Sequence, residues 1–240
     1  MNATASLNPE PSSTELRVGG LARLSTCDWP GELAATVFCQ GCGWDCVYCH
    51  NPHLRPAQCE EQLSWKEILT FLENRKGLLD GVIFSGGEPT LQSALLGAIQ
   101  SVRNLGFRVG LHTAGAVPER FSAVLPWVDW VGFDVKAPFY AYSRITGIEQ
   151  SGARAHQSLR LLLASGVPYE VRTTVHPDLL TGEELLAQRD LLLSLGVTHY
   201  TVQRFRAAGV DTNRCFPPLE EPQFNLPSGF GEDFYRFVLR

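Results

Sequence analysis

Three cysteines lie close together in a short stretch that follows an apolar segment. Cys42, Cys46 and Cys49 have the spacing C-x3-C-x2-C. Three thiolates at this spacing can bind three irons of a cubane iron–sulfur cluster and leave the fourth iron without a protein ligand, whereas ferredoxin-type sequences supply a full set of cysteines. Open coordination distinguishes catalytic from structural metal sites, so the stretch predicts a cluster at which another molecule binds. Tyr48, next to the last cysteine, is expected to pack over the cluster and shield it from water.

A fourth nearby cysteine leaves a second interpretation open. Cys39 and Cys42 form a C-x2-C pair, as do Cys46 and Cys49, so the same stretch could hold zinc on four cysteines. Structural zinc sites usually take their two pairs from positions further apart in the sequence, and these pairs nearly adjoin. We therefore favour the iron–sulfur cluster over a zinc module.

Length and composition indicate an ordinary globular protein. The chain has 240 residues, 44% of them hydrophobic and 19% charged, which is typical of a single domain with a substantial core. The net charge of −5 argues against nucleic acid as the main partner. Clustered cysteines without a secretory signal predict the reducing cytoplasm, and no apolar run is long enough to cross a membrane. We expect a disordered lead over residues 1–15 and one domain over 16–240.

Short apolar strands alternate with amphipathic helices along most of the chain. A strand at 16–24 precedes this alternation. The predicted strands that follow are 33–38, 81–84, 107–113, 128–135, 169–175 and 199–203, and the helices are 64–76, 91–105, 119–125, 151–164 and 183–195. Such alternation is typical of a parallel α/β sheet with right-handed crossovers. In barrels of this kind the chemistry lies at the carboxyl ends of the strands, where the cysteine loop also falls.

Polar motifs end four of the later strands. Gly86 and Gly87 would let the backbone approach a ligand closely, and Glu88 offers a carboxylate suited to an ammonium group. Asp134 and Lys136 lie two residues apart, so both point to one face of a strand and should pair with each other or with a zwitterionic ligand. The remaining positions are Arg172, which could bind a carboxylate through two hydrogen bonds, and Gln203. A structural ion pair remains an alternative for Asp134, Lys136 and Arg172.

Several of these stretches resemble a known family. C-x3-C-x2-C with an aromatic residue before the third cysteine resembles the signature of radical S-adenosylmethionine enzymes. The longer stretch from STCDWPG (25–31) to CHNP (49–52) is similar to the anaerobic ribonucleoside-triphosphate reductase activating proteins, which are glycyl-radical activating enzymes. Similar segments continue to about Arg206. In this family the position of Cys39 is commonly apolar, so Cys39 is expected to be spare.

The resemblance implies a fold and a set of cofactor contacts. The fold is a partial (β/α)6 TIM-like barrel over about residues 33–206, with an N-terminal lead-in strand and a short C-terminal tail. The cofactors are one [4Fe-4S] cluster and S-adenosylmethionine, since only Cys59 lies between Cys49 and Gly81, where several related activating enzymes carry a cysteine-rich insertion. Cofactor contacts are expected from Tyr48, Gly86, Gly87, Glu88, Asp134, Lys136, Arg172 and Gln203. The family commonly has Asp-Thr-Asn-Gly where this chain has HTAG (112–115), so we expect His112 to be a buried, hydrogen-bonded histidine.

The implied activity is the reductive cleavage of S-adenosylmethionine to a 5′-deoxyadenosyl radical. That radical would take a hydrogen from a glycine of a partner enzyme, expected to be an anaerobic ribonucleoside-triphosphate reductase. An external one-electron reductant such as flavodoxin or ferredoxin is implied as a second partner. A radical enzyme acting on a small molecule, like 7-carboxy-7-deazaguanine synthase, would share every cofactor motif and stays an alternative.

Overall fold

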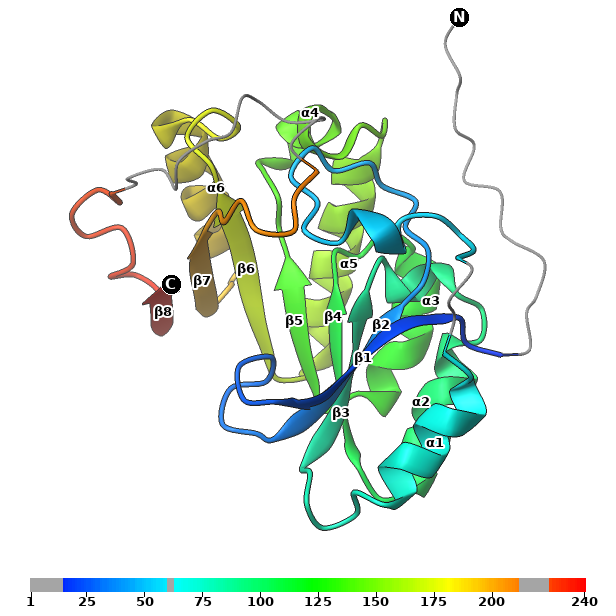
Figure 1. Ribbon diagram of the computed structural model, residues 1–240. Helices are drawn as coiled ribbons and strands as arrows, with labels where there is room; N and C mark the ends of the chain where they lie inside the picture. The colour runs from blue at the N-terminus through cyan, green and yellow to red at the C-terminus, as the bar shows by residue number, and fades with distance from the viewer. Residues whose placement is uncertain (1–14, 60–62, 212–224) are drawn as a thin grey trace, which may run out of the picture.

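The computed structural model describes residues 15–59, 63–211 and 225–240 (Figure 1). Within these residues one eight-stranded sheet has its strands in sequence order. Strand β1 is antiparallel to β2, and every later pair is parallel. The strands are β1 (Val18–Ser25), β2 (Ala34–Cys39), β3 (Gly81–Gly86), β4 (Arg108–Thr113), β5 (Trp130–Asp134), β6 (Tyr169–Val175), β7 (His199–Arg204) and β8 (Arg236–Leu239). Strands β1 and β8 form the two edges of the sheet, so the barrel is open.

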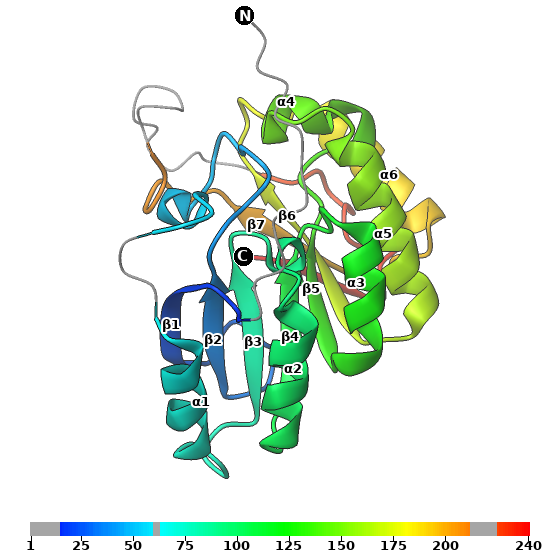
Figure 2. The same cartoon turned by 90° about the vertical axis from the view of Figure 1, so that its right-hand side faces the viewer.

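The helices cover one face of this sheet, which is therefore its outer face (Figure 2). They are α1 (Trp65–Glu73), α2 (Leu95–Asn104), α3 (Pro118–Val124), α4 (Tyr142–Thr146), α5 (Ser151–Ser165) and α6 (Gly182–Ser194). Short 3-10 turns lie at η1 (Pro52–Leu54), η2 (Pro89–Leu91), η3 (Leu125–Trp127) and η4 (Phe139–Ala141). Phe84, Leu111 and Phe133 are fully buried between sheet and helices. No helix among the residues described is long and apolar enough to span a membrane.

The expected partial barrel is confirmed, with three differences in detail. Residues 91–105 are not one helix, because Gln92 adopts an extended backbone and its side chain donates to the carbonyls of Arg17 and Gln40, at 2.8 and 3.0 Å. Helix α4 was not predicted. The short C-terminal tail contains a further strand, β8, which was not predicted and which extends the sheet in parallel with β7. The expected lead over residues 1–15 lies, apart from Glu15, outside the described residues.

An aromatic side chain fills the barrel at the amino ends of the strands. Trp29, from the β1–β2 turn, stacks on Trp130 with ring centroids 5.9 Å apart. Gly81 and Gly110 make room for it, since a Cβ at either position would lie 2.8 or 3.0 Å from the Trp29 ring. With Ala34 and Ile83 these two tryptophans form a small apolar cluster separate from the main core. The barrel interior is therefore filled at the amino ends of the strands and can hold a ligand only toward their carboxyl ends.

We predict that Gly81→Ala will lower the free energy of unfolding by about 1–3 kcal/mol, as expected for overpacking. The added Cβ would meet the Trp29 ring at 2.8 Å and the Arg108 carbonyl oxygen at 3.0 Å. Urea denaturation measures the change. Gly97→Ala is the matched control. Gly97 lies within α2, and a Cβ added there would have no atom of another part of the chain within 4 Å. Alanine should therefore raise the free energy of unfolding by about 0.5–1 kcal/mol. Equal effects of the two substitutions would contradict the packing described for Trp29.

Candidate active site

A cavity of about 440 Å³ opens at the carboxyl ends of the strands. Every site residue expected from the sequence lines it. These residues are Cys42, Cys46, Cys49, Tyr48, Gly86, Gly87, Glu88, Asp134, Lys136, Arg172 and Gln203. They come from β3, β5, β6 and β7 or the loops that follow them and from the loop after β2, so the parallel topology brings together positions that span more than 160 residues of sequence.

The cysteine loop is held by backbone hydrogen bonds rather than by its own regular structure. Gly41 and Cys42 donate to the carbonyls of Leu54 and Arg55, at 2.7 and 3.0 Å. Asp45 and Val47 donate to the carbonyls of Thr146 and Ile145 in α4, at 2.8 and 3.0 Å. The unpredicted helix α4 therefore supports the loop that carries the thiols.

Burial makes the thiols of Cys42 and Cys46 poor nucleophiles unless a cation binds them. It raises the pKa of Cys42 to about 12 and that of Cys46 to about 11. A coordinated metal deprotonates a thiol outright, so these groups fit metal ligands. Cys39 differs: its side chain is fully buried at the end of β2, packs in the main core, and lies outside the cavity lining.

The two glycines at the end of β3, Gly86 and Gly87, serve the packing of the cysteine loop. At Gly87 a Cβ would lie 2.2 Å from the Gly41 carbonyl oxygen, and at Gly86, where φ is +113°, it would lie 2.4 Å from the Cys39 nitrogen. The expectation that they are needed for close approach of a ligand is therefore incomplete. Both glycines line the cavity, but a side chain at either one would first collide with the backbone around the cysteines.

Glu88 is a buried carboxylate that joins two loops of the cavity wall. Its Oε1 accepts hydrogen bonds from the Thr90 amide, the Thr90 hydroxyl and the Thr113 hydroxyl, at 3.1, 2.7 and 2.6 Å. Its Oε2 accepts from the Ala114 amide at 2.9 Å. The carboxylate thus ties the β3 loop to the end of β4, and Oε2 keeps one further position for a donor.

Arg172 crosses the floor of the cavity. Its Nε donates to Asp134 Oδ1 at 2.9 Å and its Nη2 to the Gly132 carbonyl at 3.3 Å. Burial raises the pKa of Asp134, but the charges of Arg172 and Lys136 outweigh it and hold this pKa below its ordinary value. Lys136 Nζ lies 3.9 Å from Asp134 Oδ2. Two cations therefore surround the Asp134 carboxylate, and their remaining donors fit an anionic group.

His112 is hydrogen-bonded, as expected, but it also lines the cavity. Its Nε2 lies 2.8 Å from the carbonyl oxygen of Asp28 and 3.2 Å from Arg172 Nη1. Burial, reinforced by the Arg172 charge, lowers the pKa of His112 to about 3, so the imidazole is neutral at physiological pH. Asp28, which the sequence analysis did not select, thereby reaches the cavity floor from the β1–β2 turn.

Aromatic side chains enclose the cysteines. Tyr48 is 5% exposed, with its ring 5.7 Å from Lys136 Nζ. His50 contacts Phe205 at 5.7 Å between ring centroids, and its Nε2 lies 2.9 Å from the Arg206 carbonyl, which connects the cysteine loop to the segment after β7. Tyr48 Oη and Trp44 Nε1 are buried without a hydrogen-bond partner in the described part of the chain. Unpaired buried donors beside three thiols fit a bound group that accepts hydrogen bonds.

Trp44, His50 and Asp28 were not predicted as site residues. The signal available for Trp44 and His50 was their position within or beside the cysteine run; Asp28 lay in the 25–31 stretch that carried the resemblance. Trp44, His50 and Asp28 line the cavity because of how the loops pack, which the types of these residues do not reveal.

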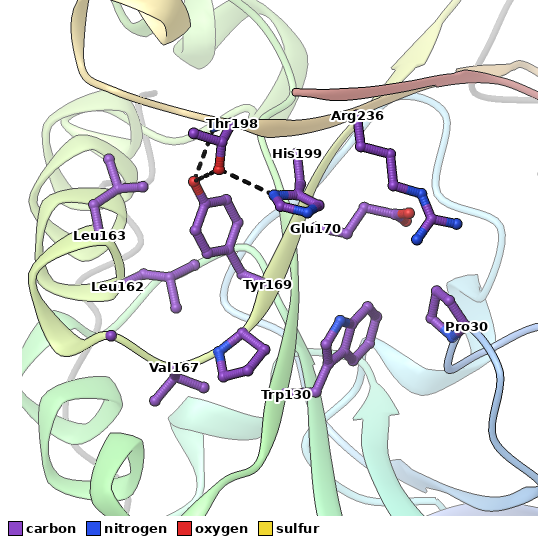
Figure 3. A pocket seen from close by; sticks show the side chains of 12 residues that line it. Pro30, Trp130, Leu162, Leu163, Val167, Tyr169, Glu170, Thr198, His199 and Arg236 are labelled. Carbon is purple, nitrogen blue, oxygen red and sulfur yellow. Dashed lines mark hydrogen bonds between the residues drawn. The ribbon is translucent and has the colours of Figure 1, made fainter. Parts of the chain in front are cut away.

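A second cavity, of about 350 Å³, lies at the opposite ends of the strands (Figure 3). It is lined by the first residues of four strands, Trp130, Tyr169, His199 and Arg236, with Pro30 and apolar residues of the α5–β6 segment. It contains no cysteine and none of the predicted site residues. The chemistry predicted from the sequence therefore belongs to the larger cavity.

Comparison with known proteins agrees with this geometry. A model of the radical SAM superfamily matches residues 36–187. A protein of Methanocaldococcus jannaschii named as a glycyl-radical enzyme activating enzyme is 29% identical over 180 residues, which cover 70% of this chain and 72% of that protein. The pyruvate formate-lyase-activating enzyme of Clostridium pasteurianum is 31% identical over 175 residues, with the same two coverages.

The fold also resembles a solved structure. SuiB of Streptococcus suis, bound to its precursor peptide SuiA, superposes with a TM-score of 0.57 at 12% identity, over 72% of this chain and 40% of that one. At this identity the likeness concerns the fold alone. The family model and the relatives show that this chain is a member of the radical S-adenosylmethionine superfamily, enzymes that use a [4Fe-4S] cluster and S-adenosylmethionine to generate radicals.

Proposed function

We propose that this enzyme generates a glycyl radical on a partner protein, and that the partner is an anaerobic ribonucleoside-triphosphate reductase. The observation that carries the first part is the likeness to activating enzymes over 70% of the chain. Support for the second part comes from the sequence around the cysteines, where residues 25–31 and 49–52 resemble the activating proteins of that reductase.

In this proposal Cys42, Cys46 and Cys49 hold the cluster and leave one iron open. When bound, the cluster and S-adenosylmethionine supply electron transfer and cleavage of the sulfonium C–S bond, which yields the 5′-deoxyadenosyl radical. The protein supplies binding, orientation and exclusion of water. The position of all three thiol-bearing residues in the lining of one cavity supports their assignment as ligands.

The methionine end of S-adenosylmethionine carries a carboxylate and an ammonium group. Among the cations of the lining, Arg172 and Lys136, which lie beside Asp134, could bind the carboxylate, and Glu88 Oε2 could accept from the ammonium group. Gln203, at the end of β7, is proposed to contact the adenosine end. Tyr48 and His50, which close over the cysteines, would keep water and competing hydrogen donors from the radical.

We propose that the electron that reduces the cluster comes from an external one-electron donor. A flavodoxin or ferredoxin is the proposed one-electron reductant. The predicted cytoplasmic location is consistent with such donors, and it remains part of the proposal.

Replacing Cys42, Cys46 or Cys49 singly with alanine should abolish the cluster, because each thiolate binds one iron. Iron and sulfide content and the visible absorption of anaerobically reconstituted protein measure this. Cys39→Ala is the matched control and should keep the full cluster, since Cys39 packs in the core outside the cavity. A full cluster in any of the first three variants would overturn the ligand assignment. Loss of the cluster in Cys39→Ala would indicate that Cys39 is a fourth ligand.

Lys136→Ala should leave the cluster intact and weaken S-adenosylmethionine binding about tenfold, the cost of about one charge-assisted hydrogen bond. Isothermal titration calorimetry on cluster-loaded protein gives the dissociation constants. Lys66→Ala, on the exposed side of α1, is the control and should bind normally. Glu88 is less suitable for this test because its carboxylate also joins two loops. Unchanged affinity in Lys136→Ala would remove Lys136 from the proposed cofactor contacts.

Incubation of the reconstituted enzyme with S-adenosylmethionine, a reductant and an anaerobic ribonucleoside-triphosphate reductase should produce a glycyl radical detected by electron paramagnetic resonance. One equivalent of 5′-deoxyadenosine should form per radical. A radical on another glycyl-radical enzyme, with none on the reductase, would retain the activity and change the partner. Turnover of a small molecule with no protein radical would instead support a function like that of 7-carboxy-7-deazaguanine synthase. A cluster whose spectrum does not change when S-adenosylmethionine is added would indicate an electron-transfer module.

A further inference from the structure

Trp44 lies between the first two cysteines of the cluster loop and is 3% exposed. Its ring packs edge-on against Tyr142, with centroids 5.9 Å apart. Its indole nitrogen, Nε1, is buried and makes no hydrogen bond to any described residue. The ring is therefore well packed, but its one polar group, the indole N–H, has no hydrogen-bond acceptor among the described residues.

A buried N–H without a partner is costly. Such a group typically costs about 1–3 kcal/mol, and native proteins rarely keep one unless a bound group accepts it. Phenylalanine would fill the same space against Tyr142 without this cost. The presence of a tryptophan is thus better explained by an acceptor that binds in the cavity than by packing.

The residues around Trp44 favour sulfur as that acceptor. Trp44 lines the cavity together with Cys42, Cys46 and Cys49. Its backbone amide already hydrogen-bonds the Cys42 thiol. Two other buried donors of the lining have no hydrogen-bond partner among the described residues. Tyr48 Oη belongs to a ring that lies 5.7 Å from Lys136 Nζ, on the side of the proposed cofactor contacts, and Arg55 Nε belongs to a guanidinium that already pairs with Asp45.

We propose that the Trp44 indole N–H donates a hydrogen bond to a sulfur of the bound cluster. The proposal rests on the cysteine ligands assigned above. Hydrogen bonds to cluster sulfurs are one of the factors that set reduction potential. Reduction adds negative charge to the cluster, so a donor stabilises the reduced form more than the oxidised form and raises the potential. Trp44 thereby eases delivery of the electron that radical formation requires.

Trp44→Phe removes the N–H and keeps an aromatic ring against Tyr142. A redox titration of the reconstituted full chain, followed by electron paramagnetic resonance, measures the midpoint potential without S-adenosylmethionine. We expect a shift to more negative potential equivalent to a threefold to tenfold change in the reduction equilibrium, where tenfold is 59 mV for one electron. Trp127→Phe, on the outer face and 39% exposed, is the matched control and should not shift.

A second measurement covers the case in which Trp44→Phe does not retain the cluster. In wild-type protein labelled with 15N at the indole nitrogens, electron–nuclear double resonance of the reduced cluster should show a nitrogen coupling, because Trp44 is the one tryptophan in the cavity lining. Absence of that coupling overturns the proposal, as does an unshifted potential in Trp44→Phe. A shift that occurs only with S-adenosylmethionine present, or only in Tyr48→Phe, also overturns it. Loss of the cysteine assignment would be recognised separately, by a cluster that survives replacement of Cys42, Cys46 or Cys49.

Discussion

The buried guanidinium of Arg172 is the charge around which the interior of the barrel is arranged. A charge in such a place is stable only when it is paired and hydrogen-bonded, and Arg172 meets the Asp134 carboxylate at 2.9 Å and the Gly132 carbonyl at 3.3 Å. Gly132 leaves room for the guanidinium in this position, because a Cβ there would lie 2.7 Å from Arg172 Nη1. Because the positions on β5 and β6 are direct neighbours in the parallel register, Asp134 beside Arg172, topology alone brings the pair together.

The two faces of the sheet differ in what they bury, apolar side chains on the outer face and polar or charged ones toward the cavity on the inner face. This difference makes the cavity possible. On β5 the outward residues Val131 and Phe133 are fully buried against helices. The inward residues Trp130 and Asp134 face the interior, one at each end of the strand. Apolar burial on the outside supplies most of the stability, so the inside is free to hold charges that a core would exclude. The Trp29 ring fills the interior at the amino ends of the strands, so the interior can hold a ligand only at the carboxyl ends.

The sequence contained most of the barrel and the main residues of the cavity, because both are local signals. Strand periodicity placed β6 at its observed bounds, and the rule that parallel strands end on one face placed Glu88, Asp134, Arg172 and Gln203 together. What it lacked depends on contacts between distant segments. The support of the cysteine loop by Thr146 and Ile145, the collision that keeps Gly87 a glycine, and the addition of β8 to the sheet all arise from tertiary packing. No pattern within a window of ten residues encodes them.

His112 shows how such contacts change the meaning of a residue. A single nitrogen, Nε2, faces both the Asp28 carbonyl at 2.8 Å and Arg172 Nη1 at 3.2 Å. A carbonyl can only accept and a guanidinium can only donate, so the neutral ring can satisfy one of them at a time. The shorter distance favours donation to Asp28, which leaves Nη1 the least firmly held polar group of Arg172. It is therefore the group that a carboxylate entering the cavity can engage at the lowest cost, while Nε and Nη2 keep the guanidinium in place.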